Sequence, residues 1–187
     1  MCPQCAWLQV TRWLERQQAR LLACKHYHVI FTIPHELHAW WLANVDAIRQ
    51  VLFASVHDTL LELLGDRKDM GAKPGIIATL HTWSQTLWLH PHLHGLVTGG
   101  GLHATGQWVA VRNGVLLPLR VVMAFLRGKR LAAIRQGVGQ GRLTLPATSR
   151  HGLGASGLRE RKAVGARRQT RRGSVWLQRA KGELWRA

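Results

Sequence analysis

Apolar and polar positions recur along this chain with two different periods, and these periods predict where strands and helices lie. Residues 28–33 are β-branched and aromatic, which is typical of a strand, and Pro34 follows it. From Leu37 to Leu63 the apolar residues recur at a mean spacing of about 3.6 residues. This spacing predicts one long amphipathic helix that stops at Gly65.

The same patterns continue through the rest of the chain. The other predicted elements are a helix over residues 7–23, strands over residues 76–83, 92–98 and 108–111, and a helix over residues 118–136. Gly99, Gly100 and Gly101 predict a turn, and Gly137 is expected to end the last helix. This order predicts an α+β fold in which helices pack on an antiparallel sheet of about four strands.

Charge adds a prediction about partners. The 187 residues contain 26 Lys and Arg against 9 Asp and Glu, a net charge of +17, which implies a polyanionic partner. Nucleic acid fits better than a membrane, because no run of 18 or more apolar residues and no signal peptide is found. Residues 142–187 are strongly basic with little apolar periodicity and are expected to be a disordered tail. Three cysteines make no disulfide framework, so a reducing cytoplasm is expected.

The most informative candidate chemistry lies in the predicted strand at His90, His92 and His94. Residues two apart on a strand project to the same side, about 6–7 Å apart, so these imidazoles can share a metal ion or a phosphate. His92 and His94 are the better pair of metal ligands, because Pro91 lacks an N–H and places His90 at the strand edge. His81 and Gln85 are candidates for a third ligand from a neighbouring element.

Several separate motifs, in this order and spacing, resemble the rolling-circle insertion-sequence transposases of the two-tyrosine HUH class, in which two histidines flank a hydrophobic residue. The similarity covers roughly residues 1–146. The segments that carry it are Cys2-Pro3-Gln4-Cys5, residues 26–37, residues 80–85, His90-Pro91-His92-Leu93-His94 and the glycine run that begins at Gly99.

The resemblance implies a metal-dependent enzyme that binds single-stranded DNA at transposon ends. In that class a tyrosine hydroxyl attacks a DNA phosphate, and the tyrosines lie on a helix after the histidine strand. The resemblance also implies Mg2+ or Mn2+, although imidazoles accept Zn2+ and other transition metals too. A zinc-binding cysteine module precedes the nuclease domain in that class.

Two departures from the class pattern change the expected activity. Cys2 and Cys5 resemble the end of the zinc module, and two thiolates cannot complete a tetrahedral site, with Cys24 a distant third. The only tyrosine, Tyr27, precedes the histidine strand and is expected to be a core aromatic rather than a nucleophile.

We therefore expect a truncated transposase fragment without its catalytic tyrosine. Its expected parts are a zinc-module remnant with a linking helix at 1–24, a catalytic-domain core at 25–141, and the basic tail at 142–187.

Aromatic and basic residues complete the expected DNA interface. Trp83 and Trp88 flank the connection into the histidine strand, a position that suits stacking on unpaired bases. Arg127, Lys129 and Arg130 would neutralise phosphates without reading sequence.

Two other functions compete with a DNA-nicking enzyme. The spacing His90-x-His92-x-His94 also fits a histidine-triad nucleotide hydrolase, in which His92 would attack a nucleotide phosphate without a metal. Alternatively, the chain is a remnant that binds DNA by charge and has no catalytic turnover.

Overall fold

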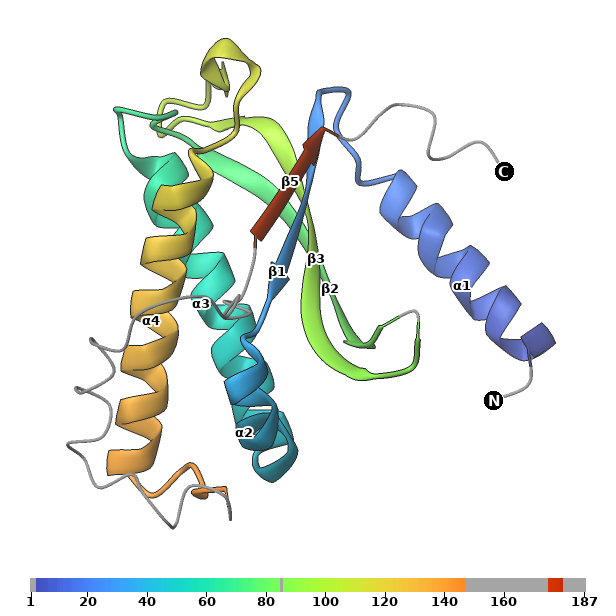
Figure 1. Ribbon diagram of the computed structural model, residues 1–187. Helices are drawn as coiled ribbons and strands as arrows, with labels where there is room; N and C mark the ends of the chain where they lie inside the picture. Colours follow the sequence, from blue (N-terminus) through green and yellow to red (C-terminus); the bar gives the residue numbers. More distant parts are fainter. Residues whose placement is uncertain (1–2, 85, 147–174, 180–187) are drawn as a thin grey trace.

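A layer of helices packs on one face of an antiparallel sheet in the computed structural model, which describes residues 3–84, 86–146 and 175–179 (Figure 1). The helices are α1 (Pro3–Gln18), α2 (His38–Ala43), α3 (Val45–Gly65) and α4 (Leu119–Gly139), with short 3-10 turns η1 (His35–Leu37) and η2 (Arg112–Gly114). The strands are β1 (His26–Thr32), β2 (Lys73–Trp83), β3 (Leu89–Leu102), β4 (Trp108–Ala110) and β5 (Val175–Arg179). The predicted α+β fold is confirmed.

The sheet order is β2-β3-β1-β5, with β4 paired to the far end of β3. Every pairing is antiparallel, and β3 lies between β2 and β1, so the histidine strand is hydrogen-bonded along both edges. A strand held on both sides is a firm support for side chains that must keep fixed spacing.

The hydrophobic core lies between the sheet and α3 and α4. Alternate residues of β1, such as Val29 and Phe31, face this core together with Leu93 and Val97 of β3. Leu60 of α3 belongs to the same cluster. Because successive strand residues point to opposite faces, the intervening residues of β1 and β3 lie on the side of the sheet away from the core.

The single long helix predicted from Leu37 to Gly65 is wrong, because the chain breaks at Asn44 between α2 and α3. Asn44 has non-helical dihedral angles (φ −148°, ψ 50°). Its side-chain amide donates to the carbonyl oxygen of Thr144 at 2.8 Å, and the Thr144 N–H donates to Asn44 Oδ1 at 2.7 Å. Apolar periodicity continues across the break, so the pattern alone conceals it.

The glycine run is also not a turn, because Gly99, Gly100 and Gly101 all lie within β3. A Cβ added to Gly100 would come within 2.6 Å of the Trp108 ring, and one added to Gly99 would come within 2.9 Å of the Lys25 carbonyl oxygen. The glycines therefore allow close approach of neighbouring chain segments rather than a reversal of direction.

At the C-terminal side, two details differ from the sequence-based expectation. Gly137 lies inside α4 and does not end it, and a Cβ there would meet the side chain of Leu143 at 2.7 Å. Residues 175–179, expected to be part of a disordered tail, form β5 and pair with β1. The rest of that predicted tail from residue 147 onward lies outside the described residues.

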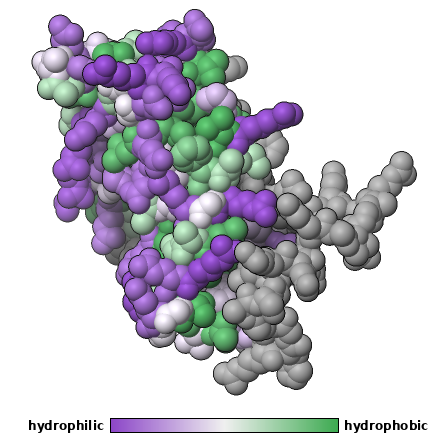
Figure 2. Space-filling model, turned by 90° about the vertical axis from the view of Figure 1, so that its left-hand side faces the viewer, coloured by the Kyte–Doolittle hydropathy of each residue, from purple (hydrophilic) through white to green (hydrophobic). Residues whose placement is uncertain are grey.

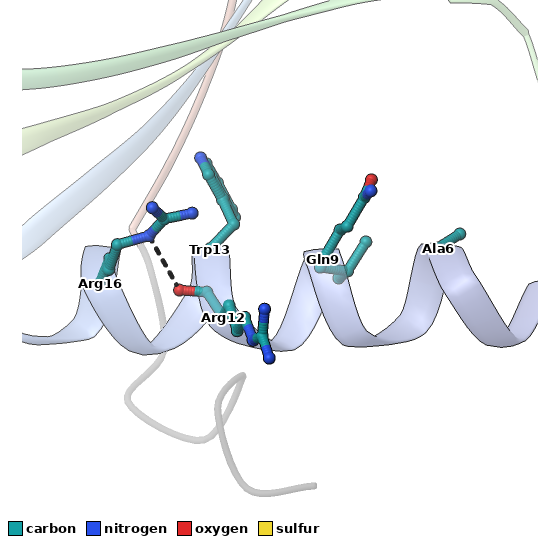
Figure 3. A pocket seen from close by; sticks show the side chains of 6 residues that line it. Ala6, Gln9, Arg12, Trp13 and Arg16 are labelled. Carbon is teal, nitrogen blue, oxygen red and sulfur yellow. Dashed lines mark hydrogen bonds between the residues drawn. The ribbon is translucent and has the colours of Figure 1, made fainter.

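Helix α1 lies on the other side of the sheet from α3 and α4 (Figure 1). Its exposed residues include Trp7 and Trp13, and a shallow depression on its surface is lined by Val10, Trp13 and Arg16 (Figure 3). The outer face of the helical layer mixes hydrophilic and hydrophobic side chains (Figure 2). Among the described helices, none has the length and apolar character needed to cross a bilayer.

Candidate metal centre

Three histidines from the β2–β3 hairpin converge on the face of the sheet opposite to α3 and α4. The strand register places His81 of β2 directly opposite His92 of β3, and Thr79 opposite His94. One ring nitrogen from each of His81, His92 and His94 lies within 4.8 Å of the other two. Among the described residues, this is the one group of three or more potential ligand side chains that meets so closely.

The ring positions agree with a shared ligand site. The ring centroids of His81 and His94 are 4.3 Å apart, and those of His92 and His94 are 4.9 Å apart. Nitrogens bound to one tetrahedral ion, each at about 2.1 Å, would be about 3.4 Å apart. The third pair, His81 and His92, has centroids 5.4 Å apart, so the three rings would have to draw together to share one ion.

Hydrogen bonds to the other ring nitrogens orient two of these histidines. His92 Nδ1 donates to the backbone carbonyl oxygen of His90 at 2.5 Å, which leaves the lone pair on His92 Nε2. His94 Nδ1 is hydrogen-bonded to Nε2 of His28, on β1, at 2.8 Å. Outer contacts of this kind are usual around metal-ligating histidines.

Electrostatics favours uncharged rings at this site. Burial, and then the nearby His81, His92 and His28, lower the pKa of His94 to about 4. Burial, and then His92, also lowers the pKa of His81. A metal ion binds the neutral imidazole, so His94 is already in the form that binds at neutral pH.

Three of the predicted metal ligands belong to the converging group in the structure. His92 and His94 lie on one face, as their spacing predicts, and His81 joins them. His90 lies on the same strand with its ring 5.1 Å from that of His92, yet it is not part of the converging group. Gln85 lies outside the described residues. Sequence reasoning gave His28 no role, although the alternation of His26 and His28 on a strand was a usable signal.

The only tyrosine in the sequence faces away from this site. Tyr27 is buried in the core, and its hydroxyl donates to the carbonyl oxygen of Gly114 at 2.6 Å. Its neighbour His28 points to the opposite side of β1, toward His94. The expectation that Tyr27 is a core aromatic is confirmed by this burial.

The predicted DNA-contacting residues have very different surroundings. Trp83 and Trp88 are 59% and 76% exposed and stand at the end of the β2–β3 hairpin next to the histidines. Their side chains are therefore accessible to a partner. Between them, Leu87 has a positive φ of 59° and its N–H donates to the Ser84 carbonyl, so the connection is a tight turn.

The three basic residues of α4 do not form one surface. Arg127 is exposed, whereas Lys129 forms an ion pair with Glu62 at 2.6 Å. Arg130 is buried, its Nη1 donates to the Thr32 carbonyl oxygen at 2.8 Å, and burial lowers its pKa to about 10. A buried guanidinium does not fit the surface phosphate contact that was predicted for Arg130.

The cysteine prediction stays open. Cys2 lies outside the described residues, and the side chain of Cys5 is not described. Cys24, which is described, is a free, partly buried thiol. The zinc remnant and the proposed domain divisions therefore remain predictions.

Comparison with known proteins identifies the family. A family model described as "Putative transposase" matches residues 75–172, which include the whole histidine hairpin from His81 to His94. A second model, described as "Transposase zinc-binding domain", matches residues 1–33. The chain belongs to this transposase family, and its resemblance to insertion-sequence transposases is confirmed. Nothing in these matches supports a histidine-triad hydrolase.

Two curated relatives extend the match. The "Putative transposase y4qJ" of Sinorhizobium fredii is 38% identical over 143 residues, covering 76% of this chain and 36% of the relative. The "Transposase for insertion sequence element IS801" of Pseudomonas savastanoi pv. phaseolicola is 35% identical over 107 residues, covering 57% of this chain and 25% of the relative. The chain thus spans about a third or less of the length of these relatives.

Among solved structures, the metal-bound conjugative relaxase TrwC in complex with oriT DNA is similar with a TM-score of 0.48 and 13% sequence identity. The similarity covers 60% of this chain and 43% of that one.

Proposed function

We propose that this chain is the DNA-handling core of an HUH transposase, which binds single-stranded DNA and holds a divalent metal ion at His81, His92 and His94. The observation that carries the proposal is the convergence of these three ring nitrogens within 4.8 Å, in a chain of the transposase family. A bound divalent ion would draw negative charge from a phosphate oxygen of the DNA.

The donor set supports a transition metal. Three neutral imidazoles suit Mn2+, Zn2+ and other transition ions better than Mg2+, which prefers oxygen ligands. Of the two ions implied by the resemblance, we therefore favour Mn2+.

Exposed residues at the hairpin end would bind the DNA strand. Trp83 and Trp88 are placed to stack on unpaired bases beside the histidines. Arg127 of α4 remains available for a phosphate, whereas Arg130 is buried and Lys129 is already paired with Glu62.

The same geometry argues against strand cleavage by this chain alone. A tyrosine nucleophile must reach the phosphate at the metal, and Tyr27 is buried on the opposite face with its hydroxyl engaged. The chain would bind DNA in a metal-dependent manner without forming a covalent phosphotyrosine link.

The test combines DNA binding with a search for a covalent adduct. Fluorescence anisotropy of a labelled single-stranded oligonucleotide is measured with Mn2+ and with chelator, and the same mixtures are then run on a denaturing gel. We expect Mn2+ to tighten binding for the wild type and not for the double variant His92→Ala/His94→Ala. His57→Ala, which removes an exposed histidine of α3, is the matched control.

Each outcome bears on a separate part of the proposal. If the double variant keeps the full Mn2+ effect, the histidines are not the metal site. If an adduct forms, the chain contains a nucleophile and the non-cleaving assignment is wrong. If DNA binding is equally tight in chelator, the alternative of a remnant that binds DNA by charge alone is correct.

A further inference from the structure

A fourth histidine, His28, contacts the histidine group from the other side of β3. It lies on β1, a strand that supplies none of the three converging nitrogens. His28 Nε2 is 2.8 Å from His94 Nδ1, and the two rings are stacked with centroids 5.0 Å apart and planes 21° apart. We propose that His28 is a positioning residue that holds His94 in the tautomer and orientation that direct its Nε2 toward the metal.

The strand register explains how His28 reaches His94. Ile30 of β1 is directly opposite His94, and His28 is the next residue of β1 on the same face, diagonally across from His94. Diagonal neighbours on antiparallel strands are within reach of long or aromatic side chains. Ile30 offers no hydrogen-bonding group, so the contact with His94 Nδ1 comes from the diagonal position.

The role follows from the proton count of a neutral imidazole. Such a ring has one N–H and one lone pair, on different nitrogens. When His94 carries its hydrogen on Nδ1 and donates it to His28 Nε2, the lone pair of His94 is on Nε2. When His28 donates instead, His94 carries its hydrogen on Nε2 and that nitrogen cannot bind a metal.

His92 shows the same arrangement with a partner that fixes the direction. Its Nδ1 donates to the His90 carbonyl oxygen, which can only accept. His28 can either donate or accept, so the direction of the bond to His94 depends on which nitrogen of His28 carries its hydrogen. In the proposed arrangement His28 accepts at Nε2 and holds His94 as the Nδ1–H form before any metal binds. The benefit to metal binding rests on the proposed metal site, whereas the hydrogen bond and stacking do not.

His28 is not a fourth ligand in this arrangement. Its Nε2 is used by His94 Nδ1, and the group of ring nitrogens within 4.8 Å consists of His81, His92 and His94 in the part of the chain that is described. His28 therefore acts on the site through His94.

The experiment separates the hydrogen bond from the stacking. His28→Phe keeps a flat ring beside His94 and removes the acceptor, whereas His28→Gln keeps an acceptor oxygen. His26→Ala is the matched control, because His26 is on the same strand and the same face, opposite Thr98. Thermal unfolding is measured for each variant, and His28→Leu replaces His28→Phe if the latter does not fold.

Two measurements are made on these proteins. The tautomer of His94 is determined in the metal-free protein by nitrogen NMR of the imidazole rings, and Mn2+ affinity is measured by calorimetry. We expect wild-type His94 to be the Nδ1–H form. His28→Phe should give a mixture of tautomers and bind Mn2+ about 10–100-fold more weakly. His28→Gln and His26→Ala should remain close to the wild type in both measurements.

The positioning role is overturned if His28→Phe leaves the His94 tautomer unchanged and Mn2+ affinity within twofold of the wild type. A wild type that binds no Mn2+, while its His94 tautomer still responds to His28→Phe, would overturn the proposed metal site and leave the positioning of His94 intact. The two failures are thus distinguishable.

Discussion

The two faces of the sheet are built from the same strands, but one face forms the hydrophobic core and the other carries the candidate metal site. On the helical face, Phe31 and Leu93 are completely buried and form the core. On the opposite face, His92 and His94, which flank Leu93 in the sequence, are only partly buried and converge with His81. Because side chains alternate along a strand, one segment supplies both stability and chemistry. Substitutions at two consecutive residues of β3 should therefore differ, one acting on stability and the other on metal binding.

The largest expected effect is on the helical face. Leu93→Ala removes a fully buried side chain and should lower the free energy of unfolding by about 2–5 kcal/mol. His94→Ala, one residue away, should change it by less than about 1 kcal/mol in chelator, while strongly weakening Mn2+ binding. Urea denaturation compares the two, and equal destabilisation would contradict the division between faces.

A smaller effect is expected for DNA binding at the hairpin end. Trp88→Ala should weaken single-stranded DNA binding by about 1–3 kcal/mol if the indole stacks on a base. Phe125→Ala, which truncates an exposed aromatic of α4 on the helical side, is the control and should leave affinity unchanged. Anisotropy titrations measure both, and a DNA affinity unaffected by Trp88→Ala would remove Trp88 from the interface.

A smaller effect on stability is expected when the Tyr27 hydroxyl is removed. Tyr27→Phe removes the hydrogen bond to the Gly114 carbonyl oxygen and should cost about 1 kcal/mol of stability. It should not alter Mn2+ affinity or DNA binding, because the hydroxyl lies on the helical face. A loss of metal-dependent DNA binding in this variant would show that Tyr27 takes part in the chemistry after all.

The smallest effect concerns pH. The folded protein holds the pKa of His94 near 4, below the 6.5 of an unfolded chain. Between these values the unfolded state binds more protons, so the stability of the metal-free protein should fall as the pH is lowered from 6.5 to 4. The thermal midpoint, measured in chelator, should fall less for His94→Asn than for the wild type. An identical pH dependence of the two proteins would argue against a depressed His94 pKa.

Much of the fold and part of the site follow from local pattern. The period-two spacing of His92 and His94 placed them on one strand face, and the β-branched run at residues 28–33 located β1. These features depend on neighbours along the chain, which a sequence displays directly.

What the sequence did not reveal depends on partners distant along the chain. The place of His81 beside His92 follows from the β2–β3 register, and the break at Asn44 is linked to Thr144. The burial of Arg130 likewise requires the Thr32 carbonyl, far away in sequence. No window of a few residues contains that information. The prediction that Arg130 contacts a DNA phosphate at the surface was therefore wrong.

The origin of His81 on a different strand from His92 and His94 gives this site a further use. All three nitrogens meet only when β2 and β3 are paired in native register, since a slip of one residue would turn His81 toward the core. Metal affinity followed through a denaturant series would therefore report when this hairpin assembles, independently of the signal from the helices. Metal binding at this site would then show whether the sheet forms before or after the helical layer.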